Sequence, residues 1–311
     1  MSSIILIVLP VFGLIFLGWL VRRMGVLGHH ATSELTRFVV VLALPALLFD
    51  IVATARLEDI WQPGFIAVYG LGAMVMFGLT LLVSMRSGRH LADAAIDGLN
   101  SGYANTGFIG FPLGLAALGP AALAPTMIAT IITACIVFAA AIILVELGLR
   151  TETGRGRVLL KVGGSLIRNP LLWAPAVAAL FPLLGMSLPA PALSFVTLLG
   201  GAASPCALVA LGLFLAAKQE GGTREIPAVT GLVIAKLFLH PLITWLLGVY
   251  LFALPPALLH AAVLIAALPT GTGSFMLAEF HRREAGITSK VILVSTLLSV
   301  LTVSGYLALI R

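Results

Sequence analysis

The chain has 311 residues, of which 10% are charged and 60% are hydrophobic, and its mean hydropathy is +1.14. Soluble domains carry about 25% charged residues, so this composition excludes an ordinary soluble domain and indicates a protein embedded in the lipid bilayer. The formal net charge is +6, but the basic residues stand in short clusters between apolar segments, so we expect no nucleic-acid partner.

Ten apolar segments follow one another along the chain. About 20 apolar residues cross the hydrocarbon core of a bilayer as a helix, the one form in which a single segment satisfies its own backbone there. We therefore predict an all-α polytopic membrane protein with ten transmembrane helices. The predicted spans are residues 4–21, 35–54, 64–85, 94–118, 124–149, 169–184, 191–217, 226–250, 256–279 and 288–310.

The connections between these spans alternate in charge. The odd-numbered connections hold 15 of the 18 Lys and Arg residues. Positive charge marks cytoplasmic loops, which predicts a multi-pass protein of the cell (inner) membrane with both termini outside the cytoplasm. The first span has neither a basic leader before it nor a cleavage site after it, so we expect a retained helix and not a signal peptide.

The most polar connection divides the chain into two halves of five spans. We place a first five-helix repeat at 1–150, a cytoplasmic linker at 151–168 and a second five-helix repeat at 169–311. An odd number of spans in each half makes the halves run in opposite senses, which predicts a 5+5 inverted repeat. Pro45 and Pro205, 160 residues apart, each fall within the second span of a half and agree with this arrangement.

Residues that interrupt helices lie within the fourth and ninth spans, in "YANTGFIGFPLG" and "AALPTGTGSFMLAEF". A break inside a membrane releases backbone polar groups, so it faces protein or a water-filled cavity. Half-helix N-termini attract anions, and neither break itself contains Asp or Glu. We therefore predict that a small organic anion, a carboxylate, binds between the two breaks. The candidate substrate-binding residues are Asn105, Thr106, Gly107, Pro112, Pro269, Thr270, Thr272, Gly273 and Ser274.

Two ionisable residues of the eighth span, Lys236 and His240, are four positions apart and share one helix face. Such a pair is either a counter-charge or coupling site for the substrate, or a snorkelling lysine beside a packed histidine. The two cysteines, Cys135 and Cys206, lie far apart within apolar segments. We read them as small buried side chains and expect no disulfide, metal site or cofactor.

Four stretches carry a resemblance: "NTGFIGFPL", "NPLLWAPAVAAL", "ASPCALVALGLFLA" and "AALPTGTGSFMLAEF". Together they resemble the auxin efflux carrier family, in its bacterial branch of malonate-transporter-like members. The resemblance implies that helices 4 and 9 are broken and cross near their prolines. It also implies that helices 1, 2, 6 and 7 form a scaffold and the interface of a homodimer. Helices 3–5 and 8–10 would then form a transport domain that carries organic acids by an elevator-like movement.

The same resemblance assigns Asn105 and Pro112 to the fourth-helix motif of the family and Pro269 to the ninth-helix proline. The chain departs from it at one position. Many relatives have an asparagine shortly after the ninth-helix proline, where this chain has Gly273. The departure removes a side-chain amide, so the resemblance does not identify the substrate of this chain.

Three other classes of membrane protein compete with an organic-anion carrier. A sodium-coupled bile-acid-type carrier of the same crossed-helix class would need more acidic or amide residues than Asn100 and Asn105. A passive anion channel also uses broken helices. An intramembrane metalloprotease would need a motif such as H-E-x-x-H, which the sequence lacks, so we do not expect an enzyme.

Overall fold

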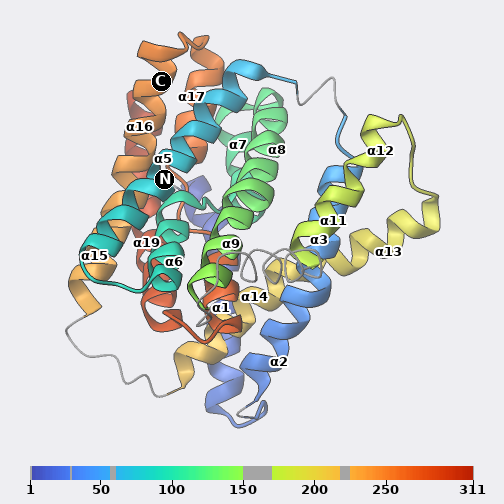
Figure 1. The fold of residues 1–311 in the computed structure, drawn as a ribbon, viewed down its shortest axis with the longest axis vertical. Coiled ribbons are helices and arrows are strands. Elements are labelled where there is room, and N and C mark those ends of the chain that lie inside the picture. The colour runs from blue at the N-terminus through green and yellow to red at the C-terminus, as the bar shows by residue number, and fades with distance from the viewer. Residues whose placement is uncertain (1, 29, 57–60, 150–169, 218–224, 311) are drawn as a thin grey trace, which may run out of the picture.

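The computed structural model describes residues 2–28, 30–56, 61–149, 170–217 and 225–310, and its regular elements within these ranges are helices (Figure 1). In the first half they are α1 (Ser2–Arg23), α2 (Ala31–Phe38), α3 (Leu44–Ala53), α5 (Pro63–Arg86), α6 (Leu91–Gly102), α7 (Phe111–Leu118), α8 (Leu123–Ile131) and α9 (Phe138–Gly148). In the second half they are α11 (Pro170–Ala178), α12 (Leu180–Leu183), α13 (Ala190–Gly201), α14 (Ala203–Ala216), α15 (Ile226–Ile234), α16 (His240–Leu246), α17 (Pro256–Ala266), α18 (Gly273–Phe280) and α19 (Ala285–Leu309). The predicted linker at 151–168 lies outside the described ranges.

Short π-helical turns join several of these helices into longer stretches. Among the residues that the structure describes, six stretches are long and apolar enough to cross a membrane: Ala31–Ala53, Pro63–Arg86, Pro120–Gly148, Ala190–Ala216, Ile226–Leu251 and Ala285–Leu309. Shorter apolar stretches are Thr106–Leu118, Pro170–Leu183 and Pro256–Ala266. Large apolar side chains of the helices, such as Phe195, Leu198 and Leu301, are exposed on the outside, as expected for helices that face lipid. The all-helical membrane class is therefore confirmed, while the count of ten spans and the inverted repeat stay predictions.

The helices α1 and α14 cross in close contact and bring together segments from the two halves of the chain. Gly18 of α1 and Gly212 of α14 lie at this crossing. A methyl group at Gly212 would overlap the backbone carbonyl of Ile15, and one at Gly18 would overlap that of Val209. Small residues let membrane helices approach closely, so these two glycines fix the contact between α1 and α14.

The Gly212→Ala variant is expected to be less stable by about 2 kcal/mol, because the added methyl pushes two packed backbones apart. Thermal unfolding of the purified protein in detergent measures the loss. The matched control is Gly13→Ala on α1, where a methyl group meets no atom within 4 Å. Equal melting temperatures for the two variants would contradict this account of the crossing.

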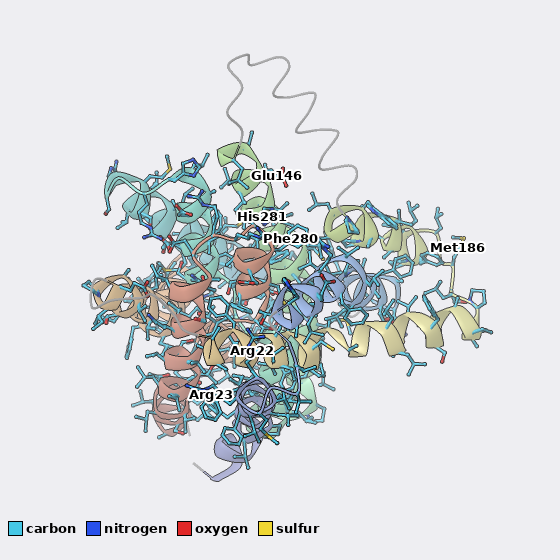
Figure 2. The ribbon with its side chains drawn as sticks, turned by 90° about the horizontal axis from the view of Figure 1, so that it is seen from below. Arg22, Arg23, Glu146, Met186, Phe280 and His281 are labelled. Atoms are coloured by element: carbon cyan, nitrogen blue, oxygen red, sulfur yellow. The ribbon has the colours of Figure 1, made fainter. Side chains whose placement is uncertain are left out.

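Several of the predicted cytoplasmic connections meet on one side of the molecule. Figure 2 views this side and shows Glu146, Phe280 and His281 close together. Three side-chain contacts join residues from different connections or from the helix ends beside them: His281 with Glu146 at 3.6 Å, Arg283 with Asp93 at 2.5 Å, and Lys290 with Glu225 at 2.5 Å. Helix ends beside several of the predicted cytoplasmic connections therefore contact one another, and the side of the membrane on which they lie stays a prediction.

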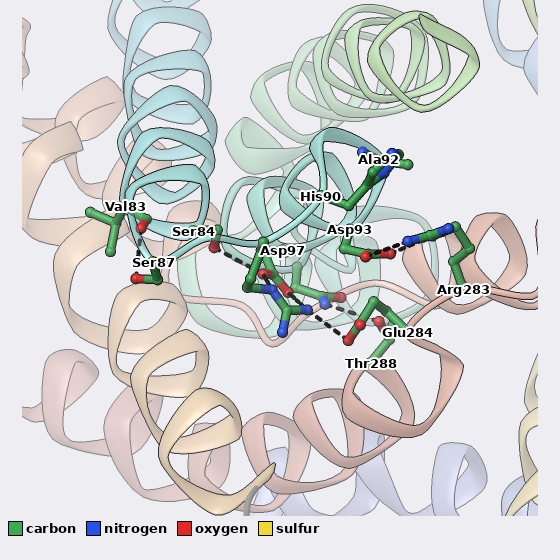
Figure 3. A network of polar contacts seen from close by, with 12 residues as sticks. Val83, Ser84, Ser87, His90, Ala92, Asp93, Asp97, Arg283, Glu284 and Thr288 are labelled. Carbon is green, nitrogen blue, oxygen red and sulfur yellow. Dashed lines mark hydrogen bonds and ion pairs between the residues drawn. The ribbon is translucent and has the colours of Figure 1, made fainter. Parts of the chain in front are cut away.

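A denser polar network ties the start of α6 to the segment between α18 and α19 (Figure 3). Arg89 lies 2.7 Å from Asp97 and 2.7 Å from Glu284. Arg283 donates two parallel hydrogen bonds to Asp93, both at 2.5 Å, and this hydrogen bonding raises the pKa of the Arg283 guanidinium above its ordinary value. Bidentate pairs of this kind fix orientation as well as adding energy.

A double-mutant cycle on Asp93 and Arg283 is expected to give a coupling energy of about 1 kcal/mol, the upper range for a partly exposed pair with good geometry. The variants are Asp93→Asn, Arg283→Gln and the two combined, compared by thermal unfolding. If the two single effects simply add, the pair does not hold α6 to the segment before α19.

Candidate functional site

The chain leaves the helical conformation at two places that lie against each other. Residues 103–105 separate α6 from the helical stretch that leads into α7, and residues 267–272 separate α17 from α18. Ala104 and Thr270, at the centres of these segments, form an isolated antiparallel bridge. The two interruptions that the sequence places far apart are therefore direct neighbours.

Two backbone hydrogen bonds hold this contact. The Asn105 N–H donates to the Pro269 carbonyl at 2.9 Å, and the Gly271 N–H donates to the Tyr103 carbonyl at 3.0 Å. Backbone groups released within a membrane need such partners, because lipid offers none. Each segment thus satisfies part of the backbone of the other.

Each segment is followed by a helix N-terminus. Asn105 caps the first, because its Oδ1 accepts a hydrogen bond from the Phe108 N–H at 3.3 Å. Pro112, which has no N–H, lies where the π-helical turn Thr106–Gly110 passes into α7. The second N-terminus is that of α18, whose N-cap residue Thr272 makes no side-chain capping bond. The first N–H groups of a helix lack intrahelical partners. At the first end the N–H groups of Thr106 and Phe108 are taken up by Ala104 and Asn105, which leaves that of Gly107, whereas at α18 those of Thr272 and Gly273 have no partner among the described residues.

A cavity of about 390 Å³ opens beside the two segments. Five of the nine predicted substrate-binding residues line it: Asn105, Thr106, Gly107, Thr272 and Gly273. The described residues that line the cavity include no charged side chain. Its polar groups are hydroxyls, one amide and the backbone at the helix N-termini, which is a set suited to a small anion.

The other walls were not predicted from the sequence. Apolar residues of α3 and the turn before it, including Val39, Leu44 and Leu48, form one side, and Ser204 and Pro205 of α14 form another. Tyr103 also lines the cavity. An aromatic residue within an interruption, matched by the closely spaced glycines of the other interruption, is the sequence signal that points to Tyr103.

The remaining four predicted residues, Pro112, Pro269, Thr270 and Ser274, are not among those that line the cavity. Thr270 and Ser274 instead hold the segment in place. The Thr270 hydroxyl donates to the Asn100 carbonyl at 2.7 Å, and the Ser274 hydroxyl donates to the Gly271 carbonyl at 2.9 Å. Their hydroxyl groups therefore stabilise the backbone around the cavity.

Lys236 and His240 are fully buried and do not line the cavity. The Lys236 ammonium donates to the carbonyl of Ala266 at 2.7 Å and lies 3.2 Å from Nδ1 of His240. Ala266 is the last residue of α17, and a helix C-terminus carries partial negative charge. Lys236 therefore caps the helix end that precedes the 267–272 segment, and its role as a counter-charge stays a prediction.

Two further features bear on the chemistry. Within the described ranges, no group of three His, Cys, Asp or Glu side chains is arranged to hold a metal ion. Cys135 and Cys206 are both free thiols and partly exposed.

Comparison with known proteins places the chain in a family. A family model described as membrane transport protein matches residues 3–307. The chain belongs to this family. The resemblance to the auxin efflux carrier family is thereby confirmed.

Curated relatives of this membrane transport protein are similar over most of their length. A protein of Rhizobium meliloti (strain 1021) named "Putative malonate transporter" is 33% identical over 100% of this chain and 97% of its own length. An "Uncharacterized transporter" of Methanothermobacter thermautotrophicus is 26% identical over 95% of this chain and 94% of its own. The "Uncharacterized transporter YfdV" of Escherichia coli (strain K12) is 26% identical over 87% of this chain and 86% of its own length.

Proposed function

We propose that the protein is a secondary transporter that carries small organic anions, carboxylates, by alternating access. The observation that carries the proposal is the uncharged cavity onto which two helix N-termini open, at Asn105 and at Thr272. Each N-terminus presents about half a positive charge, and the unbonded N–H groups of Gly107 at the first and of Thr272 and Gly273 at the second offer donors. An anion gains from both, whereas a cation site would need acidic or other oxygen ligands in place of these donors.

The architecture proposed for this function is a ten-helix inverted repeat with broken, crossing fourth and ninth helices. In such a repeat helix 1 corresponds to helix 6 and helix 2 to helix 7. The contact of α1 with α14 then matches the contact of α11 with α3, and the contact of α5 with α6 matches that of α16 with α17. The bridge between Ala104 and Thr270 supports a crossing of the two interrupted helices.

The position of the cavity supports an elevator-like movement. Its lining residues on α3 and α14 belong to the proposed scaffold of helices 1, 2, 6 and 7. The residues on the 103–111 and 271–276 stretches belong to the proposed transport domain of helices 3–5 and 8–10. A substrate held between two bodies moves across the membrane when one slides against the other. We propose a homodimer through the scaffold, in the inner membrane, with both termini outside the cytoplasm.

The name of the Rhizobium meliloti relative makes malonate the first acid to examine. A short dicarboxylate fits a site with two N-termini, because each end offers donors to one carboxylate. We propose short carboxylates of this kind as the substrate class.

Competition in proteoliposomes tests the charge requirement. Labelled uptake of the most active acid, chosen from mono- and dicarboxylates that include malonate, is measured against its unlabelled form and against its uncharged amide. The acid is expected to inhibit at its own KM, and the amide to inhibit at least tenfold more weakly, because it lacks the charge that the N-termini attract. Equal inhibition by the two compounds would exclude an anion site.

A further inference from the structure

Two glycines beside the cavity lie directly against the ring of Tyr103. A Cβ atom at Gly271 would stand 2.5 Å from Cε1 of the ring, and one at Gly273 would stand 2.8 Å from the Tyr103 hydroxyl. Carbon atoms that are not bonded to each other do not approach this closely. The Tyr103 ring and a side chain at position 273 therefore exclude each other.

The ring is held in this position from two directions. On one side it packs against the ring of Phe138, which is fully buried, with the centroids 5.7 Å apart. On the other side the Tyr103 carbonyl accepts the hydrogen bond from Gly271, which fixes the backbone of both residues. Turning the ring away from Gly273 would require Phe138 to repack, and packed interiors resist such changes.

The hydroxyl of Tyr103 is available to a ligand. It lies at the first residue of α18, where the helix N-terminus begins. Within the described part of the chain it makes no hydrogen bond, and Tyr103 is one of the residues that line the cavity. A phenolic O–H has a proton to donate, so an anion at this N-terminus has one more donor beside it.

We propose that Tyr103 determines the specificity of the site: its hydroxyl supplies a donor at the N-terminus of α18, and its ring limits the length of the acid. The inference rests on the proposed function. The Tyr103 ring fills the side of the cavity next to Gly271 and Gly273, so it sets the length of the longest acid that the site accepts.

Two variants of Tyr103 separate the hydroxyl from the ring. Tyr103→Phe keeps the volume and removes the donor, so the KM of every transported acid is expected to rise about tenfold, with the preference for chain length unchanged. Tyr103→Ala opens space beside Phe138. For acids that now reach this space, each added methylene is expected to lower the inhibition constant about fourfold.

The test is inhibition of labelled uptake in proteoliposomes by the linear dicarboxylates malonate, succinate, glutarate and adipate. The parent protein and Tyr103→Phe are expected to reject acids beyond the same length, and Tyr103→Ala to accept longer ones. If Tyr103→Ala has the length profile of the parent protein, the inference is overturned while the proposed function stands. If the parent protein transports no acid at all, the proposed function itself fails.

Exchange between the two positions gives a second test. Gly273→Asn alone is expected to lose at least tenfold in kcat/KM, because its side chain collides with the Tyr103 ring. The double variant Tyr103→Ala, Gly273→Asn is expected to recover transport of short acids, since the amide takes the place that the ring leaves. Thermal unfolding of each variant confirms that the proteins compared are folded. If the double variant has no higher kcat/KM for short acids than Gly273→Asn alone, the inference that positions 103 and 273 share one space is overturned.

Discussion

The Asn105→Ala variant is expected to retain about 1% of the kcat/KM of the parent protein. The side chain does two things at once. Its Oδ1 caps the helix end at Phe108, and its amide lines the cavity and donates to the carboxylate under the proposed function. Loss of the cap costs about 1 kcal/mol, and loss of a hydrogen bond to a charged group costs roughly 1.5–3 kcal/mol. Transport kinetics in proteoliposomes measure the combined effect.

Substitutions at the same position separate the two contributions. Asn105→Asp keeps an oxygen that caps the Phe108 N–H but places a negative charge in the cavity, so it is expected to abolish uptake of acids while the protein stays folded. Ser304→Ala, far along α19, is the matched control for loss of one polar group and is expected to transport normally. Full activity of Asn105→Asp would mean that the substrate binds elsewhere.

The second large effect is expected at Lys236. Lys236→Met leaves the Ala266 carbonyl without the donor that lies 2.7 Å away, which costs about 1–3 kcal/mol. The same change removes a buried charge whose insertion costs roughly 2.5–3.5 kcal/mol. The melting temperature is therefore expected to change little, whereas transport falls at least tenfold, because the end of α17 positions the 267–272 segment.

The way in which transport falls distinguishes a cap from a counter-charge. A cap acts through the geometry of the segment, so Lys236→Met is expected to lower the kcat for the acids and to leave the ratio of inhibition by an acid to inhibition by its amide unchanged. Lys236→Arg keeps a donor and a charge and is expected to recover part of the activity. If Lys236→Met raises the KM for acids alone, with kcat unchanged, Lys236 acts on the substrate as a counter-charge and the capping account is wrong.

Much of the site could be predicted from single residues and their neighbours along the chain. Helix-interrupting residues such as Asn105 and Pro269 mark where a membrane helix stops, since their effect on the backbone is local. The apolar segments likewise predict helices at positions where the structure has them, because helix formation in a membrane depends on the segment itself. The family was also evident from these stretches.

What failed to follow from sequence depends on partners in space. Thr270 and Thr272 are equivalent in type, yet the first holds the Asn100 carbonyl and the second lines the cavity. From the sequence alone Lys236 is a charged residue within a membrane span, and its contact with the end of α17 is seen only in the structure. The meaning of Gly273 was also hidden, because the Tyr103 ring that occupies its side-chain space is 170 residues away in the chain.

The most direct test of the central claim is counterflow in proteoliposomes. Vesicles that contain the purified protein are loaded with unlabelled malonate or another carboxylate of the panel and diluted into the same acid in labelled form. A carrier with an anion site is predicted to give a transient, saturable accumulation of label above equilibrium, and Asn105→Asp is predicted to lack it. Label that enters without overshoot and without saturation would show a continuous pore and contradict the proposed carrier.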